Sequence, residues 1–280
     1  MKIIDAHLHY FAASERFSRS AEVAGHSAEV SGLIDAFEAN DIVGGIGMGT
    51  VPDDLPYAPL TLPFTKKNLP KCLVQCLGIP AEHLSLGNEE AAIILFEQLI
   101  KSREAVGLKV YAGYRYFYVN DPIYHPFYEL AEEYDIPVVI HTGDTANPQA
   151  RLKYAHPLTV DEAAVNFPRV KFVMAHYGNP WIVDATEVAK KNPNVYIDLS
   201  GLAEGLFQPG QFCNDYSGYI DMLRTWLAYL GRYDKIMYGS DWPLVNIPAY
   251  IELIKRLIPQ IYHNEVFYKN AKQLFNIKQF

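Results

Sequence analysis

The chain has 280 residues, of which half are hydrophobic and one fifth are charged. This composition is ordinary for a soluble globular protein. The net charge of −8 argues against a surface for nucleic acid or anionic lipid, because both need clustered lysine and arginine. A chain of this length buries roughly three quarters of its unfolded surface and folds without a structural metal. Any metal that it holds is therefore expected to serve chemistry.

Cysteines and the first residues indicate a reducing, cytoplasmic environment. Cys72, Cys76 and Cys213 do not form a disulfide framework, and reduced core cysteines are favoured over a metal-binding pair. The start of the chain, MKIIDAHLHY, lacks the apolar stretch of a signal peptide. No uninterrupted apolar segment reaches the length of about 18 residues that a membrane-spanning helix needs. We therefore predict a cytoplasmic protein without nucleic-acid or membrane partners.

Short apolar segments alternate with helical patterns along the whole chain. The eight expected strands cover residues 2–8, 42–49, 72–79, 105–111, 136–142, 170–176, 195–200 and 235–241. The expected helices cover residues 28–40, 88–103, 123–134, 158–167, 181–191, 217–230, 248–258 and 263–275. Apolar strands separated by helices indicate a parallel sheet that is covered on both faces. Eight such units predict an α/β fold, a (β/α)8 TIM barrel that forms a single domain over residues 1–280.

A doubly wound open sheet is the competing fold. Such a sheet usually carries a glycine-rich phosphate turn after its first strand, whereas this first strand runs into histidines. The GGIGMG segment at 44–49 lacks the G-x-G-x-x-G spacing and is interpreted as a tight strand end. The proline-rich segment 50–70 is interpreted as a long loop at the face where barrel enzymes place their specificity elements.

Five titratable residues occupy equivalent places along the predicted barrel. His7 and His9 are two residues apart in an extended segment, so their side chains point the same way. His141, His176 and Asp241 each end a strongly apolar strand, where barrel active sites lie. A single buried histidine is more often a packed core residue, but five residues that follow one rule favour a site. Their nitrogen and carboxylate atoms suit Zn²⁺, with Mn²⁺ and Fe²⁺ as alternatives.

Five segments together carry a resemblance to a known family. They are DAHLH at 5–9, VIHTGD at 139–144, MAHYGNPW at 174–181, NVYIDLSG at 194–201 and YGSDWP at 238–243. The chain resembles the amidohydrolase-related, metal-dependent hydrolases of the aminocarboxymuconate-semialdehyde decarboxylase type. The resemblance implies that one divalent metal, with water in an open position, is bound by four ligands: His7, His9, His141 and Asp241. It also implies that His176 is an acid/base group beside that water.

Further residues are candidates for contacts with the substrate. Lys109 lies about where the wider superfamily holds a carboxylated lysine between two metals, but the resemblance implies one metal, so we interpret it as a substrate or supporting contact. Tyr111 stands where close relatives often have a histidine. Arg115 and Arg151 are candidates for binding an acidic substrate, although a solvated loop explains Arg151 equally well. Asp144 either orients a ligand or caps a helix.

Two enzymatic functions and one non-enzymatic function remain open. In the favoured one, a hydrolase uses metal-activated water on a small ester, lactone or amide, with Asp241 sharing the proton of the water and His176 protonating the leaving group. The alternative is a non-oxidative decarboxylase of a small unsaturated or aromatic acid. A barrel that merely binds a ligand does not explain a complete ligand set at the strand ends. The resemblance implies that homodimers are common, and the sequence does not decide this.

Overall fold

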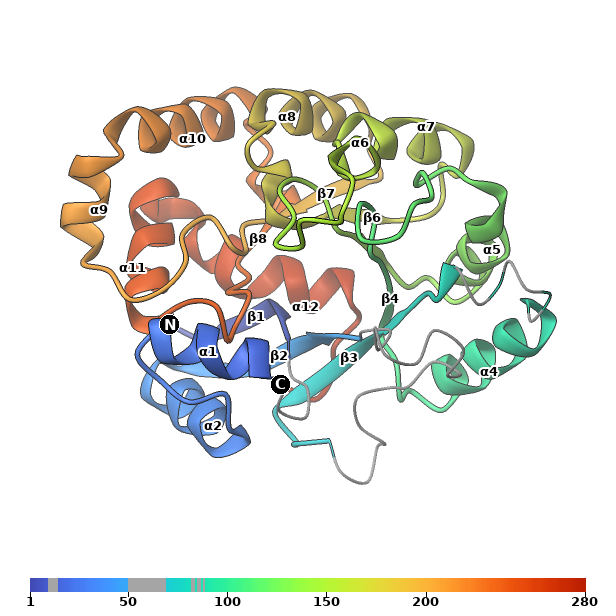
Figure 1. Cartoon of the computed structure of the whole chain (residues 1–280), viewed down its shortest axis with the longest axis horizontal. Coiled ribbons are helices and arrows are strands. Elements are labelled where there is room, and N and C mark those ends of the chain that lie inside the picture. Colours follow the sequence, from blue (N-terminus) through green and yellow to red (C-terminus); the bar gives the residue numbers. More distant parts are fainter. Residues whose placement is uncertain (10–14, 50–68, 82–83, 85–86, 88) are drawn as a thin grey trace.

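The computed structural model describes residues 1–9, 15–49, 69–81, 84, 87 and 89–280. Eight parallel strands follow one another in chain order around a single sheet (Figure 1). These strands are β1 (Ile3–Leu8), β2 (Ile42–Met48), β3 (Leu73–Gly78), β4 (Gly107–Val110), β5 (Val138–Ile140), β6 (Phe172–Met174), β7 (Val195–Asp198) and β8 (Ile236–Met237). All eight predicted strands are present, each shorter than expected, and the predicted TIM barrel is confirmed.

Backbone hydrogen bonds join the last strand region to the first. The amide of Ala6 donates to the carbonyl of Tyr238 at 2.9 Å, and the amide of Asp241 donates to the carbonyl of His7 at 2.8 Å. The amide of His9 donates to the carbonyl of Trp242 at 2.7 Å. The sheet therefore forms a nearly closed barrel, and its closure places residues from the two ends of the sequence side by side.

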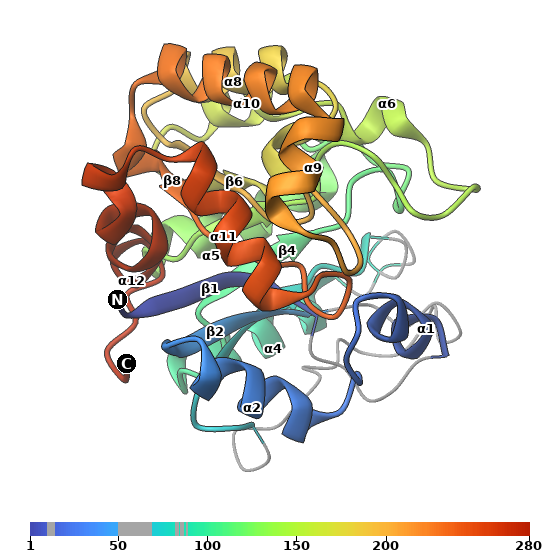
Figure 2. The ribbon, with the colours of Figure 1, turned by 90° about the vertical axis from the view of Figure 1, so that its left-hand side faces the viewer.

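Helices surround the barrel on its outer side, except for the last one, α12 (Asn270–Leu274), which lies across one end of the barrel and packs Ala271 and Leu274 against the interior layer (Figures 1 and 2). The outer helices are α1 (Glu15–Val23), α2 (Val30–Ala39), α4 (Glu89–Lys101), α5 (His125–Glu133), α6 (Leu152–Ala155), α7 (Leu158–Asn166), α8 (Ile182–Lys191), α9 (Pro209–Asp215), α10 (Ser217–Leu230) and α11 (Ile247–Leu257). The sequence did not indicate α1, α6 and α9. Two of these helices leave no apolar pattern in the sequence, because α6 has only four residues and α9 buries none of its side chains.

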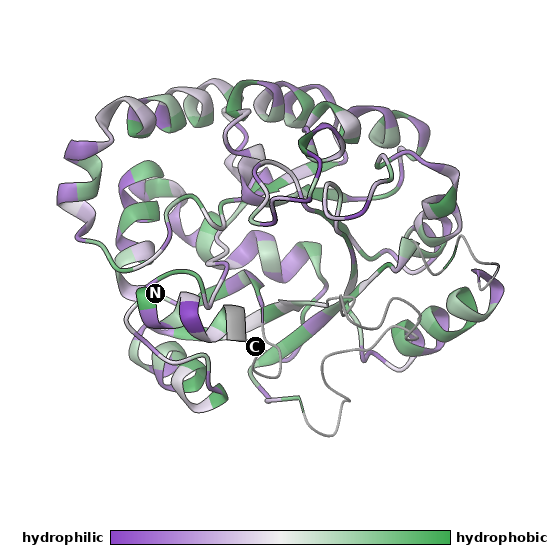
Figure 3. Ribbon diagram, in the orientation of Figure 1, coloured by the Kyte–Doolittle hydropathy of each residue, from purple (hydrophilic) through white to green (hydrophobic). Residues whose placement is uncertain are grey.

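The buried residues form two layers, one on each side of the strands. Leu108 and Val110 belong to the layer between strands and helices, whereas Cys76, Val139 and Val173 belong to the layer inside the barrel. Hydrophobic and hydrophilic residues alternate along the outer helices in Figure 3, as expected for helices that pack on one face. Since side chains alternate along a strand, Lys109 points into the barrel.

Several smaller expectations are tested by the fold. The GGIGMG segment lies largely in β2, in agreement with a strand rather than a nucleotide turn. All three cysteines are free. Most of the predicted loop 50–70 lies outside the described residues. Within the described part of the chain, each helix is too short or too polar to cross a membrane.

Candidate metal centre

His7 is fixed by a buried carboxylate at the end of β7. Its Nδ1 donates to Oδ2 of Asp198 at 2.9 Å, and both side chains are buried. Burial, and then the nearby charge of Lys109, lower the pKa of His7 to about 3. The ring is therefore neutral with its proton on Nδ1, and Nε2 presents a lone pair. That Nε2 atom is buried and has no hydrogen-bond partner among the described residues.

Asp198 is the site residue that the sequence analysis missed. Its Oδ1 accepts hydrogen bonds from the backbone amides of His176 and Ser200, each at 3.1 Å. Burial by itself raises the pKa of Asp198, but His7, His176 and Ser200 together outweigh burial and hold the pKa well below the usual range. The carboxylate is therefore ionised. Its position in VYIDLS, directly at the end of an apolar strand, is the same signal that identified the other residues.

His7, His9 and Asp241 bring three ligand atoms to one point. Oδ1 of Asp241 lies 3.1 Å from Nε2 of His9 and 3.6 Å from Nε2 of His7. One such atom from each residue lies within 4.8 Å of the others. Two ligands at about 2.1 Å from a tetrahedral ion lie about 3.4 Å apart, so the observed spacing fits a single divalent ion. Burial raises the pKa of Asp241, but His176, His9 and His7 together outweigh burial and keep the carboxylate ionised.

His141 lies one ring away from this group of three. Its ring centroid is 4.9 Å from that of His176, and its Nε2 lies 3.0 Å from the backbone carbonyl oxygen of Asp144. Because a carbonyl only accepts, Nε2 carries the proton and Nδ1 is the nitrogen that is able to bind a metal. Burial lowers the pKa of His141 well below the ordinary value, so the ring is neutral.

His176 is held in the tautomer of a base. Its Nδ1 lies 2.9 Å from Oγ of Ser200 and 3.3 Å from the carbonyl oxygen of Ser200. Since the carbonyl only accepts, Nδ1 is the protonated nitrogen, and Nε2 keeps its lone pair. The Nδ1 atom is also 4.0 Å from Oδ2 of Asp241. Burial lowers the pKa of His176, so the neutral form is ready to take up a proton.

The backbone at the site adopts conformations that residues other than glycine rarely adopt. His176 and Asp241 have φ angles of 60° and 69°, in the left-handed region that is unfavourable for residues other than glycine. Gly201 also has a positive φ, and a Cβ there would lie 3.1 Å from both Oδ2 of Asp241 and Nδ1 of His176. Only glycine therefore lets this backbone approach both groups without displacing them.

Aromatic side chains flank the histidines. Phe17 of α1 stacks on His9 with 5.6 Å between ring centroids, and Tyr114 packs edge-on against His141 at 4.9 Å. The predicted substrate residues Lys109 and Tyr111 lie close to each other, with Nζ 5.2 Å from the tyrosine ring centroid. Aromatic rings and one buried lysine therefore surround the histidines of the site.

The other predicted substrate residues lie farther out. Asp144 is exposed, and its Oδ1 accepts from the amide of Thr145 at 2.7 Å, so its side chain caps a local turn while its carbonyl holds His141. Arg151 is exposed and lies 4.2 Å above the ring of exposed Tyr116. Arg115 is half-buried. Of the predicted substrate set, the structure thus brings only Lys109 and Tyr111 into the buried interior.

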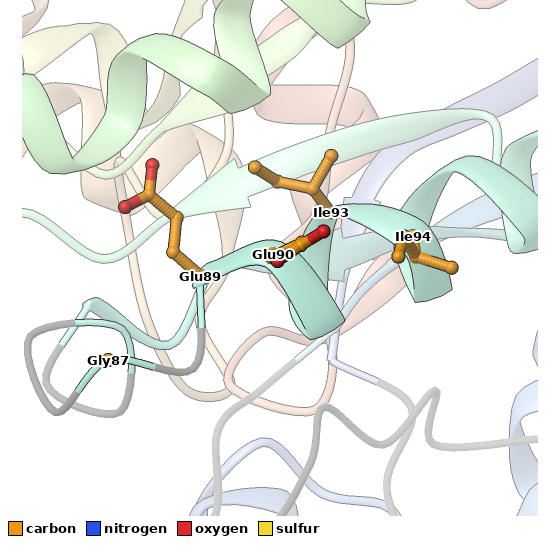
Figure 4. Close-up of a pocket in the computed structure, with 5 residues that line it drawn as sticks. All are labelled: Gly87, Glu89, Glu90, Ile93 and Ile94. Carbon is orange, nitrogen blue, oxygen red and sulfur yellow. The ribbon is translucent and has the colours of Figure 1, made fainter.

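A separate pocket lies at the start of α4 (Figure 4). It is lined by Gly87, Glu89, Glu90, Ile93 and Ile94. The two glutamates are exposed, and none of the histidines of the site lines this pocket. It is therefore distinct from the candidate metal centre.

Comparison with known proteins identifies the family of this chain. The sequence profile of an amidohydrolase family matches residues 81–277, a range that includes His141, His176 and Asp241. The chain belongs to this amidohydrolase family. Its members are metal-dependent enzymes, both hydrolases and decarboxylases, so the chain is an enzyme of this kind. Among curated proteins, no sequence matches the chain.

Solved structures share the fold at low identity. An uncharacterised TIM-barrel protein from Bordetella bronchiseptica is 19% identical, with 99% of both chains covered and a TM-score of 0.73. A probable 2-pyrone-4,6-dicarboxylic acid hydrolase from Acinetobacter baumannii is 17% identical, with coverage of 99% of this chain and 100% of that chain, and a TM-score of 0.65. A manganese-bound dihydroxybenzoic acid decarboxylase from a Polaromonas species is 16% identical, with coverage of 98% and 97% and a TM-score of 0.65.

Proposed function

We propose that this amidohydrolase is a hydrolase that acts on a small ester, lactone or amide. The observation that carries the proposal is the convergence of His7, His9 and Asp241 on one point, with His141 one ring away. These four residues would hold one divalent ion, for which we propose Zn²⁺. When bound, such an ion lowers the pKa of a water ligand from 15.7 to roughly 7 and supplies a nucleophile at neutral pH.

The protein side chains prepare this chemistry in three ways. Asp198 fixes the tautomer of His7, and the carbonyl of Asp144 fixes that of His141, which is how proteins orient metal-binding imidazoles. His176 accepts a proton at Nε2 and returns it to the leaving group, as a general base and then a general acid. Asp241 is a carboxylate before the reaction, because its neighbouring histidines together hold its pKa low, and can share the proton of the water.

A non-oxidative decarboxylase is the second candidate. Two features of the chain favour it beyond its family: the buried cation of Lys109 and the phenol of Tyr111, which lie near the proposed metal ligands. A carboxylate that leaves as CO₂ needs a cation to position it, and the substrate carbon that loses the carboxylate needs a proton donor. The structural neighbours include both a probable 2-pyrone-4,6-dicarboxylic acid hydrolase and a dihydroxybenzoic acid decarboxylase.

One assay separates the two activities. The metal-loaded protein is incubated with small lactones, esters and amides, and separately with hydroxybenzoic and unsaturated acids, while the release of the carboxylic acid product and of CO₂ is recorded. Acid release that disappears in His176→Ala supports the hydrolase, and CO₂ release supports the decarboxylase. If neither product forms with any compound although the metal is bound, the proposal of a hydrolase is contradicted. The cytoplasmic location, the homodimer and the single domain stay predictions from the sequence.

A further inference from the structure

Two buried hydrogen-bond donors inside the barrel lack a hydrogen-bond partner within the part of the chain that the structure describes. The side chain of Lys109 is 0% exposed, and neither its Nζ nor the hydroxyl oxygen of Tyr111 has a hydrogen-bond partner among the described residues. An unpaired buried polar group destabilises the protein, and a charged one does so more strongly. Two of them side by side therefore indicate that a polar ligand completes this part of the site.

Both donors lie close to the proposed metal ligands. The charge of Lys109 lowers the pKa of His7 and of His141, and Asp241 in turn acts on the pKa of both donors. Lys109 is level with Val139 of β5 in the barrel, and His141 lies two residues farther along the same segment. Tyr111 follows Lys109 by two residues, so both side chains point to the same face of the strand.

The balance of charge defines what kind of ligand fits. Asp198 and Asp241 carry two negative charges, which one divalent ion neutralises. The ammonium group of Lys109, whose pKa burial lowers to about 8, is then an excess positive charge that these two carboxylates no longer balance. A buried cation needs a paired anion, and the phenol of Tyr111 adds a second donor to it.

We propose that Nζ of Lys109 and the hydroxyl of Tyr111 form an anion subsite that binds a carboxylate group of the substrate. The substrate class is accordingly a small carboxylic acid, or an ester, lactone or amide that carries a free carboxylate. This inference rests on the proposed metal centre, since the excess positive charge arises only when the ion is bound. Lys109 and Tyr111 act here as specificity residues, whichever of the two reactions follows.

Binding of two simple carboxylates tests the subsite without knowledge of the substrate. The titrants are acetate and benzoate, with benzamide as the uncharged analogue, and heats of binding are measured on metal-loaded protein. Lys109→Met and Tyr111→Phe are expected to weaken carboxylate binding by about tenfold or more, the usual worth of a charge-assisted hydrogen bond. Benzamide binding should change by less than about twofold, because it lacks the charge that the subsite recognises.

Metal content and a matched control keep the outcomes distinct. Lys109→Met should retain the full metal content, because it removes a positive charge beside the ion. Tyr238→Phe is the control, since its hydroxyl is equally buried and unpaired among the described residues while its ring stacks on Phe267 outside the barrel. Undetectable carboxylate binding to the parent protein, or equal binding by all variants, overturns the subsite. Loss of metal from Lys109→Met also overturns it and makes this lysine part of the metal centre. A parent protein that binds no metal contradicts the proposed function instead.

Discussion

Asp198→Asn tests how the protein prepares His7 for a metal. The substitution keeps the size of the side chain, and an amide oxygen is still able to accept from the backbone amides of His176 and Ser200. The amide nitrogen then faces Nδ1 of His7 in place of Oδ2, which lies 2.9 Å away in the native protein. Two donors cannot face each other, so His7 is forced to carry its proton on Nε2, the nitrogen that is aimed at the ion.

The expected result is a loss of metal affinity of about 10- to 100-fold, the usual effect of removing an outer partner of a metal-binding histidine. The assay is a competition titration against a chromogenic chelator at constant pH. Asp161→Asn is the matched control. Asp161 is likewise a carboxylate that accepts hydrogen bonds, in its case from Lys191 and Asn192, but it belongs to helix α7 on the outside of the barrel. Circular dichroism checks that both variants are folded. If Asp198→Asn binds metal within about twofold of the native protein, the role assigned to Asp198 is refuted.

Three other substitutions test separate parts of the site. His176→Gln should keep the metal and lower turnover by about 100-fold or more, and a near-native rate at full metal content would exclude its acid/base role. Gly201→Ala should destabilise the fold by about 1 kcal/mol because of the positive φ of this residue. It should also lower turnover, since the new Cβ meets Asp241 and His176. Unchanged melting temperature and turnover would show that the close approach of the Gly201 backbone to these two side chains is unimportant. Lys235→Met should lower the free energy of unfolding by about 2–3 kcal/mol, because it removes two buried hydrogen bonds that the ammonium group donates to the carbonyls of Ala189 and Asn192. Metal affinity should stay unchanged; a change in metal affinity would link this distant lysine to the site.

Much of the fold is readable from the sequence because parallel strands buried on both faces are continuous apolar segments. All eight strands were predicted for that reason. Helices α6 and α9 were not, since a helix of four residues or one without buried side chains leaves no apolar stripe. The sequence therefore predicts the elements that build the core better than those that lie on its surface.

Some residues of the site were predictable from the sequence and others were not. His7, His9 and Asp241 share a position at strand ends, and closure of the barrel brings them together, as the prediction required. Asp198 was not predicted although it ends an apolar strand like the other site residues, and only the tertiary fold shows that it holds Nδ1 of His7. Arg151 was considered as an anion contact, but stacking on an exposed tyrosine is a property of the folded surface.

Metal stoichiometry is the most direct test of the central claim that His7 and His9 help to bind one ion. The native protein and a His7→Ala/His9→Ala variant are purified without chelator, loaded with Zn²⁺ or Mn²⁺, dialysed and subjected to elemental analysis, with circular dichroism to confirm folding. We predict one metal per native chain and none in the folded variant. Full metal content in the variant, or no metal in the native protein after loading, would contradict the account.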